Sequence, residues 1–279
     1  MKKILLYIIG LFSVLFTLVS CKVEANADVV VSFYALEELT NALVKDTNIS
    51  VKTLIEGASE PHDYEPSAKS VSSMYSAKVL IFNGNGLEEF ESSLDNELKN
   101  KIVYATSDVE SIDINGSHDP HAFASPKQLK IMLNTIKNAL IKEFSTDSKT
   151  ITNNYTNYLA ELDEVDTMYA ELFSDLSKKI VVGHEAFNYV ARDYNYTFTS
   201  VNGMNEEEPT AKKILEIQNY IKDNNINTIY GEHYEENETI ESIASEMNIK
   251  VEYLYTLEMM EDGISLIDAL KNNVNTLKK

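Results

Sequence analysis

Short apolar runs and amphipathic stretches alternate over the first half of the chain. The apolar runs are compact and rich in Val, Ile and Leu, which predicts buried strands at 29–33, 51–55, 78–82 and 101–104. The stretches between and after them have apolar residues three and four positions apart, which predicts helices at 35–45, 67–76, 87–98 and 126–144. Repeated strand–helix units of this size indicate a mostly parallel sheet covered by helices.

The same alternation returns in the second half of the chain. It predicts strands at 179–182, 197–201, 227–230 and 250–254. It predicts helices at 186–194, 210–223, 237–247 and 264–277. Pro209 lies near the first turn of one of these helices, where proline is tolerated. A second parallel sheet with its own helices follows from this pattern.

The stretch 147–176 differs from both halves. It contains no Gly or Pro, and its apolar residues recur at helical spacing, which predicts one long helix or two close ones. At ~1.5 Å per residue such a helix would be about 45 Å long, the width of a domain. We therefore expect an α/β fold with two lobes, each a mostly parallel four-stranded sheet flanked by helices. The predicted division is a first lobe at 28–145, a linking helix at 146–178 and a second lobe at 179–279.

The first residues form a separate unit. Lys2 and Lys3 precede an apolar run at 4–19, and Ser20 precedes Cys21, the single cysteine of the chain. This pattern resembles the bacterial lipoprotein signal. The resemblance implies a signal peptide at 1–20, a lipid on Cys21, a lipidated tether at 21–27 and an extracytoplasmic protein anchored to the cell membrane. The alternative is an uncleaved transmembrane helix, for which about sixteen residues are short of the ~20 required.

The length of the chain allows two lobes, and its negative charge argues against binding to nucleic acids. Without the signal peptide the chain has 279 − 20 = 259 residues, enough for two lobes, and 44% of all its residues are hydrophobic. The formal net charge is −20, and −20 − 2 = −22 once Lys2 and Lys3 are removed. Nucleic-acid binding needs basic residues, so this balance argues against a nucleic-acid partner. We expect a monomer with a soluble, acidic surface.

Three of the five histidines occupy short, turn-rich motifs. His62, His121 and His184 are separated by 121 − 62 = 59 and 184 − 121 = 63 residues, unlike the close spacing of a zinc finger. They lie in loops after predicted strands or before a helix, where open α/β sheets bind ligands. A metal bound by all three would lie in the cleft between the lobes. His118 and His233 are interpreted as surface residues, with His118 a possible helper ligand.

Five motifs together resemble the substrate-binding lipoproteins of bacterial zinc and manganese ABC transporters. Three of them contain the histidines: Pro61-His62-Asp63-Tyr64-Glu65-Pro66-Ser67, Asp119-Pro120-His121-Ala122-Phe123 and Gly183-His184-Glu185-Ala186-Phe187-Asn188-Tyr189. The others are Glu208-Pro209-Thr210 and Ile229-Tyr230-Gly231-Glu232. The resemblance extends over nearly the whole mature chain. It implies two lobes joined by a long rigid helix, in agreement with the pattern of strands and helices.

The resemblance also implies a set of four metal ligands. Three of them carry over to His62, His121 and His184, and the fourth is an acid just after the last strand, where Glu258 fits. Many relatives have an Asp-Pro pair slightly earlier, where this chain has Tyr255-Thr256, so water or Glu232 is an alternative fourth ligand. Zinc-type relatives have His at the position of His184 and manganese-type relatives have Glu. Three imidazoles and one carboxylate suit Zn²⁺, with Mn²⁺ as the alternative.

These features predict an extracytoplasmic protein that captures Zn²⁺ and delivers it to the permease of an ABC transporter. A site closed by four protein ligands leaves no position for a reacting water, so we expect no enzyme activity. The rival interpretations are a manganese-binding homologue, a surface adhesin with a structural metal, and a zinc hydrolase with Glu185 as its base. The sequence has no His-Glu-x-x-His motif to support a hydrolase.

Overall fold

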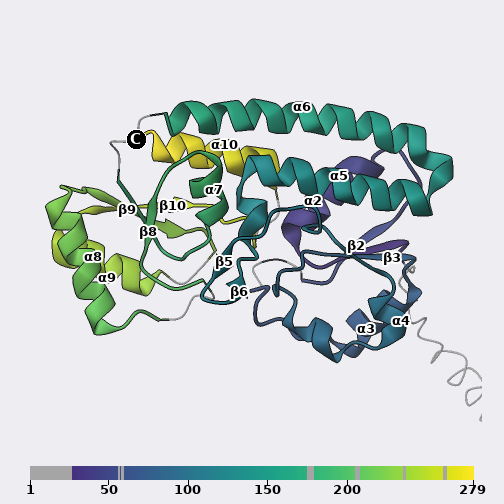
Figure 1. Ribbon diagram of the computed structural model, residues 1–279, viewed down its shortest axis with the longest axis horizontal. Coiled ribbons are helices and arrows are strands. Elements are labelled where there is room, and N and C mark those ends of the chain that lie inside the picture. The colour runs from purple at the N-terminus through teal and green to yellow at the C-terminus, as the bar shows by residue number, and fades with distance from the viewer. Residues whose placement is uncertain are drawn as a thin grey trace, which may run out of the picture.

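Two parallel four-stranded sheets organise the protein (Figure 1). The computed structural model describes residues 27–55, 57, 60–174, 179–204, 208–234, 237–259 and 263–279. The first sheet has the order β2-β1-β3-β4 and consists of β1 (Val29–Val31), β2 (Val51–Thr53), β3 (Val79–Phe82) and β4 (Ile102–Tyr104). The second has the order β10-β9-β7-β8 and consists of β7 (Ile180–Val182), β8 (Phe198–Ser200), β9 (Thr228–Glu232) and β10 (Lys250–Leu254). The predicted α/β fold with two parallel sheets is confirmed.

Helices cover both sheets and connect their strands. The first lobe contains α2 (Tyr34–Val44), α3 (Ala68–Ser76) and α5 (Pro126–Glu143). The second contains α7 (Asn188–Asp193), α8 (Ala211–Asp223), α9 (Glu238–Met247) and α10 (Leu266–Leu277). Most of these helices lie within two residues of their predicted bounds.

A single long helix, α6 (Ser148–Leu172), runs along the top of the molecule in Figure 1. A 3-10 turn, η4 (Ser145–Asp147), joins it to α5. It contacts α2 and α5 of the first lobe and α10 of the second. Residues 175–178, the end of the predicted linking helix, lie outside the described residues. The helix therefore packs against both lobes along its length.

The main hydrophobic core continues from the first lobe into the second. It includes the apolar face of α6, where Leu162 and Val165 are fully buried. Strand β7 alternates between two cores: Ile180 and Val182 belong to the main core, whereas Val181 belongs to a smaller core under α8 and α9. Successive side chains of a strand point to opposite faces, which explains the division. One face of the second sheet is thus packed on the apolar core that the first lobe shares.

Two details of the first lobe differ from the prediction. The helix predicted at 87–98 is wrong, because the structure has a 3-10 helix, η2 (Glu89–Ser93), and a short helix, α4 (Asn96–Lys99). The Asp95 carboxylate accepts a hydrogen bond from the Leu98 backbone N–H, so Asp95 caps a new helix and does not continue the old one. The loop predicted before His121 contains a hairpin of β5 (Asp113–Ile114) and β6 (Ser117–His118).

The N-terminal predictions fall on residues that the structure does not describe. The predicted signal peptide, Cys21 and the tether up to residue 26 all lie outside the described residues. Among the helices that are described, none is both long enough and apolar enough to cross a membrane.

Candidate metal centre

Loops at the carboxyl ends of the strands bring the predicted site residues together. His62 lies in the loop after β2, and His121 begins the 3-10 helix η3 (His121–Ala124) ahead of α5. His184 lies two residues after β7, and Glu258 lies four residues after β10. Two of the four side chains thus come from each lobe. All four meet where the carboxyl ends of the two sheets face each other, as open α/β sheets generally place their ligands.

The four side chains are close enough to share one ion. The Nε2 atom of His121 is 2.9 Å from Oε1 of Glu258, and Nε2 of His62 is 3.6 Å from the same oxygen. The Nε2 atoms of His121 and His184 are 3.2 Å apart. Ligand atoms of His62, His121 and Glu258 all lie within 4.8 Å of one another, and Glu258 also joins His184 and Glu232 in a second such group. Glu258 is the residue that the two groups share.

The site is buried, and several of its polar atoms lack a hydrogen-bond partner. His121, His184 and Glu258 are at most 1% exposed, whereas the His62 side chain is 11% exposed. Among the described residues, Nε2 of His62 and both carboxylate oxygens of Glu258 have no partner with hydrogen-bond geometry. Buried polar groups are rarely left unsatisfied, because desolvation without a partner is costly. These atoms therefore point to a bound cation.

Electrostatics couples the histidines to the carboxylate. Burial lowers the pKa of His121, but attraction to Glu258 and the contact with Asp119 outweigh it and raise that pKa to about 9. Burial raises the pKa of Glu258, but His121 and His184 outweigh it and hold the pKa well below its usual value. Glu258 is therefore ionised, and its negative charge is buried among imidazoles. Such a carboxylate is well suited to neutralise part of the charge of a divalent cation.

Two buried acids contact the histidines in a role that was not predicted from the sequence. Asp119 contacts the ring and the backbone of His121, and Glu232 contacts the ring and the backbone of His184. Glu232 was weighed only as a substitute ligand, and Asp119 was seen only as part of a motif. A sequence signal existed for Asp119, which lies two residues before His121. The position of Glu232 depends on how β9 lies beside β7, which no local pattern encodes.

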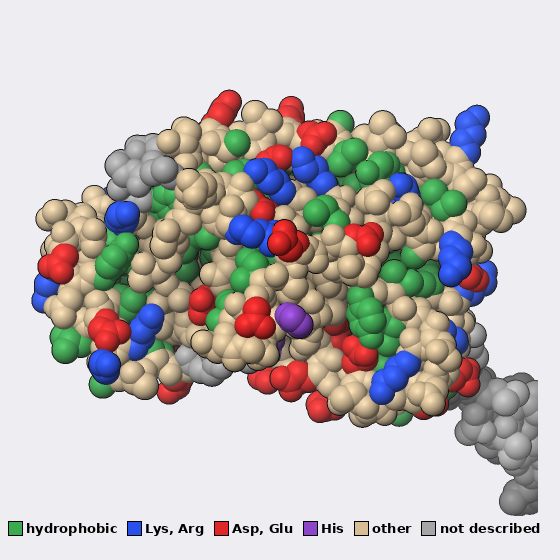
Figure 2. All heavy atoms as spheres, in the orientation of Figure 1, with side chains coloured by type: hydrophobic (Ala, Val, Ile, Leu, Met, Phe, Trp, Pro, Cys, Tyr) green, Lys and Arg blue, Asp and Glu red, His purple; other side chains and the backbone are tan. Residues whose placement is uncertain are grey.

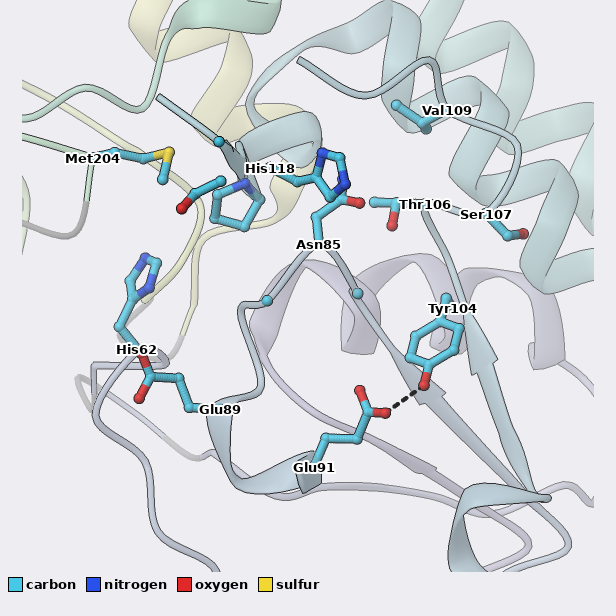
Figure 3. Close-up of a pocket in the computed structure, with 15 residues that line it drawn as sticks. His62, Asn85, Glu89, Glu91, Tyr104, Thr106, Ser107, Val109, His118 and Met204 are labelled. Atoms are coloured by element: carbon cyan, nitrogen blue, oxygen red, sulfur yellow. Dashed lines mark hydrogen bonds between the residues drawn. The ribbon is translucent and has the colours of Figure 1, made fainter. Parts of the chain in front are cut away.

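A cavity of about 710 Å³ opens beside the site and is lined by His62, His118 and Met204 among others. Figure 3 shows these three side chains around the same opening. His118 lies on the exposed strand β6, as expected of a surface histidine. His233 is half-buried and stacks on Tyr255 with ring centroids 4.0 Å apart. Acidic side chains gather along the lower edge of the face seen in Figure 2, near exposed histidine atoms.

Two α/β lobes with potential ligands gathered between them define a two-lobed binding protein. The chain belongs to the family described as zinc-uptake complex component A, periplasmic, whose model matches residues 29–279. Members of this family are components of uptake systems. The resemblance inferred from the motifs is thereby confirmed.

Individual relatives agree with this assignment. The chain is 29% identical to the zinc-binding lipoprotein AdcA of Streptococcus pneumoniae over all of its own length, but it spans only 61% of that relative. It covers 98% of the Zn(II)-bound ZnuA-like domain of AdcA from the same organism, with a TM-score of 0.79 and 28% identity over 91% of this chain. The laminin-binding protein Lmb of Streptococcus agalactiae, described as an adhesin with metal-transporting activity, has a TM-score of 0.82 and 25% identity, covering 89% of this chain and 96% of Lmb.

Proposed function

We propose that this protein captures Zn²⁺ between its two lobes, with His62, His121, His184 and Glu258 as ligands. The observation that carries the proposal is their convergence in a buried site where Glu258 and His62 have polar atoms without hydrogen-bond partners. Three imidazole nitrogens and one carboxylate oxygen form a donor set typical of zinc. The family assignment and the zinc-bound relative support the same cargo.

Zinc is favoured over manganese by the nitrogen-rich donor set. Mn²⁺ prefers carboxylate, carbonyl and water oxygens, and divalent affinities at a given site place Mn²⁺ below Zn²⁺. The test is competition between the two metals on the purified protein, with metal content measured before and after. We expect Zn²⁺ to displace Mn²⁺ at equal concentrations. A protein that retained Mn²⁺ in the presence of Zn²⁺ would contradict the zinc assignment.

Delivery to an ABC permease and anchoring through a lipid on Cys21 complete the proposed role. Membership in a family of uptake components supports a permease partner, and the lipoprotein-like sequence at 1–21 supports an extracytoplasmic position at the cell membrane. A site with four protein ligands leaves no open position for catalytic water, so the proposed role is binding and not catalysis. Labelling with radioactive palmitate, compared between the wild type and Cys21→Ala, tests the anchor. Equal label in both proteins would rule out Cys21.

A further inference from the structure

Two histidines of the site are held by carboxylates in the same way. In each case one carboxylate accepts the backbone N–H of the histidine and also contacts Nδ1 of its ring. Asp119 does this for His121 with one oxygen, and Glu232 does it for His184 with two. The two acids come from different lobes: Asp119 lies in the loop before η3, and Glu232 is the last residue of strand β9. A geometry that occurs twice at one site calls for a common explanation.

The contact at His121 is short and itself anchored by the other lobe. Oδ1 of Asp119 lies 2.9 Å from the His121 backbone nitrogen and 2.7 Å from Nδ1. Oδ2 of Asp119 accepts a hydrogen bond from the Asn188 side chain, and the Asp119 carbonyl accepts one from the Tyr189 hydroxyl. Both of these donors belong to α7 of the second lobe. Asp119 is therefore fixed from two sides while it fixes the His121 ring.

The contact at His184 uses both oxygens of Glu232. Oε1 accepts the His184 backbone N–H at 2.9 Å, and Oε2 lies 2.9 Å from Nδ1. The turn after β9 holds Glu232 in place, because the Asn237 side chain accepts the Glu232 N–H and donates to its carbonyl. Gly183 makes the close approach possible, since a Cβ there would lie 2.8 Å from Oε1. Glu232 thus lies behind the His184 ring, on the side away from Nε2.

We propose that Asp119 and Glu232 are positioning residues that hold His121 and His184 in the Nδ1–H form and direct both Nε2 atoms toward one metal ion. An acceptor on Nδ1 places the ring proton there and leaves the lone pair on Nε2, which is the atom that a metal needs. The Nε2 atoms lie 3.2 Å apart, next to Glu258. The inference rests on the proposed zinc site. It assigns Glu232 to the second layer of that site and removes it as an alternative ligand.

The decisive comparison is between Glu232→Gln and Glu232→Ala. Glutamine has the same shape, but its amide group would donate toward either Nδ1 or the backbone N–H, both of which need an acceptor. A donor at Nδ1 favours the opposite ring form, with a proton on Nε2 where the metal binds. We expect Glu232→Gln to lower Zn²⁺ affinity about 10–100-fold, the usual effect of losing such a partner. We also expect it to do at least as much damage as Glu232→Ala.

Asp119→Asn should also lower zinc affinity, because its amide group either donates toward Nδ1 of His121 or, when turned the other way, faces the donating amide group of Asn188. Asp163→Asn is the matched control: it removes one negative charge from an exposed position of α6 whose contact is Lys130. That control should retain wild-type affinity. If the wild type binds Zn²⁺ and Glu232→Gln binds it equally well, the positioning role is wrong and the zinc site stands. If the wild type binds no Zn²⁺, both the zinc site and the positioning role are wrong.

Two further measurements guard against a variant that fails to fold. Gly183→Ala leaves every carboxylate intact but displaces Glu232, so it should also weaken zinc binding, and unchanged affinity would count against the proposal. Long-range ¹⁵N–¹H NMR spectra of the zinc-loaded wild type report which ring nitrogen carries the proton. We expect Nδ1–H with metal-bound Nε2 for both His121 and His184. Metal on Nδ1 of either ring would overturn the proposal.

Discussion

At the scale of single residues, the site combines one buried carboxylate with three histidines, of which two are buried and one is partly exposed. Glu258 comes from the second lobe, is fully buried, and contacts His121 and His62, which both come from the first lobe. His62 is the partly exposed member and borders the cavity. Leu257 has a φ of 76°, a costly left-handed conformation for a bulky residue, directly before Glu258. This strained backbone conformation places the Glu258 side chain in the site.

Replacing any of the proposed ligands by alanine should lower the affinity for Zn²⁺. We expect His184→Ala and His62→Ala to reduce Zn²⁺ affinity by more than about 100-fold, above the effect typical of second-layer residues. Glu258→Ala should reduce it clearly as well. His118→Ala, on the exposed strand β6, is the control and should change little. Isothermal titration with a competing chelator measures each affinity. Unchanged binding by Glu258→Ala would remove Glu258 from the ligand set.

Glu88, a buried acid outside the proposed ligand set, should make stability depend on pH. Its oxygens accept hydrogen bonds from the Ser32 hydroxyl and from the backbone N–H groups of Asn83 and Gly84. Burial raises the pKa of Glu88, and these hydrogen bonds offset the rise only in part. A raised pKa in the folded state means that the folded protein binds the proton more tightly. The contribution of Glu88 to stability is therefore complete at pH below its ordinary value and is lost as pH rises through the raised value.

Glu88→Gln removes this titration and one acceptor, and we expect it to destabilise the protein by about 1–3 kcal/mol. The free energy of unfolding, measured with urea at several pH values, should differ most between wild type and variant at low pH. The difference should shrink as pH rises above the ordinary glutamate range. If the difference in unfolding free energy grew with pH, the predicted direction of the pH dependence would be wrong.

At the scale of elements, local sequence patterns predicted the strands and helices whose formation depends on neighbouring residues in the chain. The strands, the long helix and the three histidine loops follow from apolar spacing and from turn-rich motifs, and the structure contains them. The break at Asp95 was missed because a capping side chain competed with helical periodicity. The hairpin before His121 had a usable signal in Asn115-Gly116, both with positive φ. Asp119 and Glu232 were missed because their role depends on tertiary contacts.

The long helix α6 should contribute stability without touching the metal. Leu162 is fully buried on its inner face, so Leu162→Ala should destabilise the protein by about 2–5 kcal/mol through lost packing. Glu161→Ala, on the exposed face of the same helix, is the matched control and should be close to neutral. Urea unfolding measures both variants. Zinc affinity of folded Leu162→Ala should equal that of the wild type, and a large loss would mean that α6 positions the site.

At the scale of the whole molecule, the two lobes share their main core and therefore should unfold together. Apolar residues of the first lobe, of α6, of β7 and of α10 belong to one buried cluster. We expect a single calorimetric transition for the metal-free protein, and a higher Tm with Zn²⁺, because an ion that binds only the folded state stabilises it. A chelator should return the protein to its metal-free Tm without unfolding it. Unfolding on chelation would favour the rival interpretation of a structural metal.

The shared core also limits how an ion can enter and leave. Ile180 and Val182 face the same apolar interior as the first lobe, so rotating the lobes apart would expose that interior to water. At about 25 cal/mol per Å², each 100 Å² of apolar surface exposed would cost about 2.5 kcal/mol. The total stability of a typical protein is only about 5–15 kcal/mol. We therefore expect the ion to enter and leave beside His62, whose side chain lines the cavity, without rotation of the lobes.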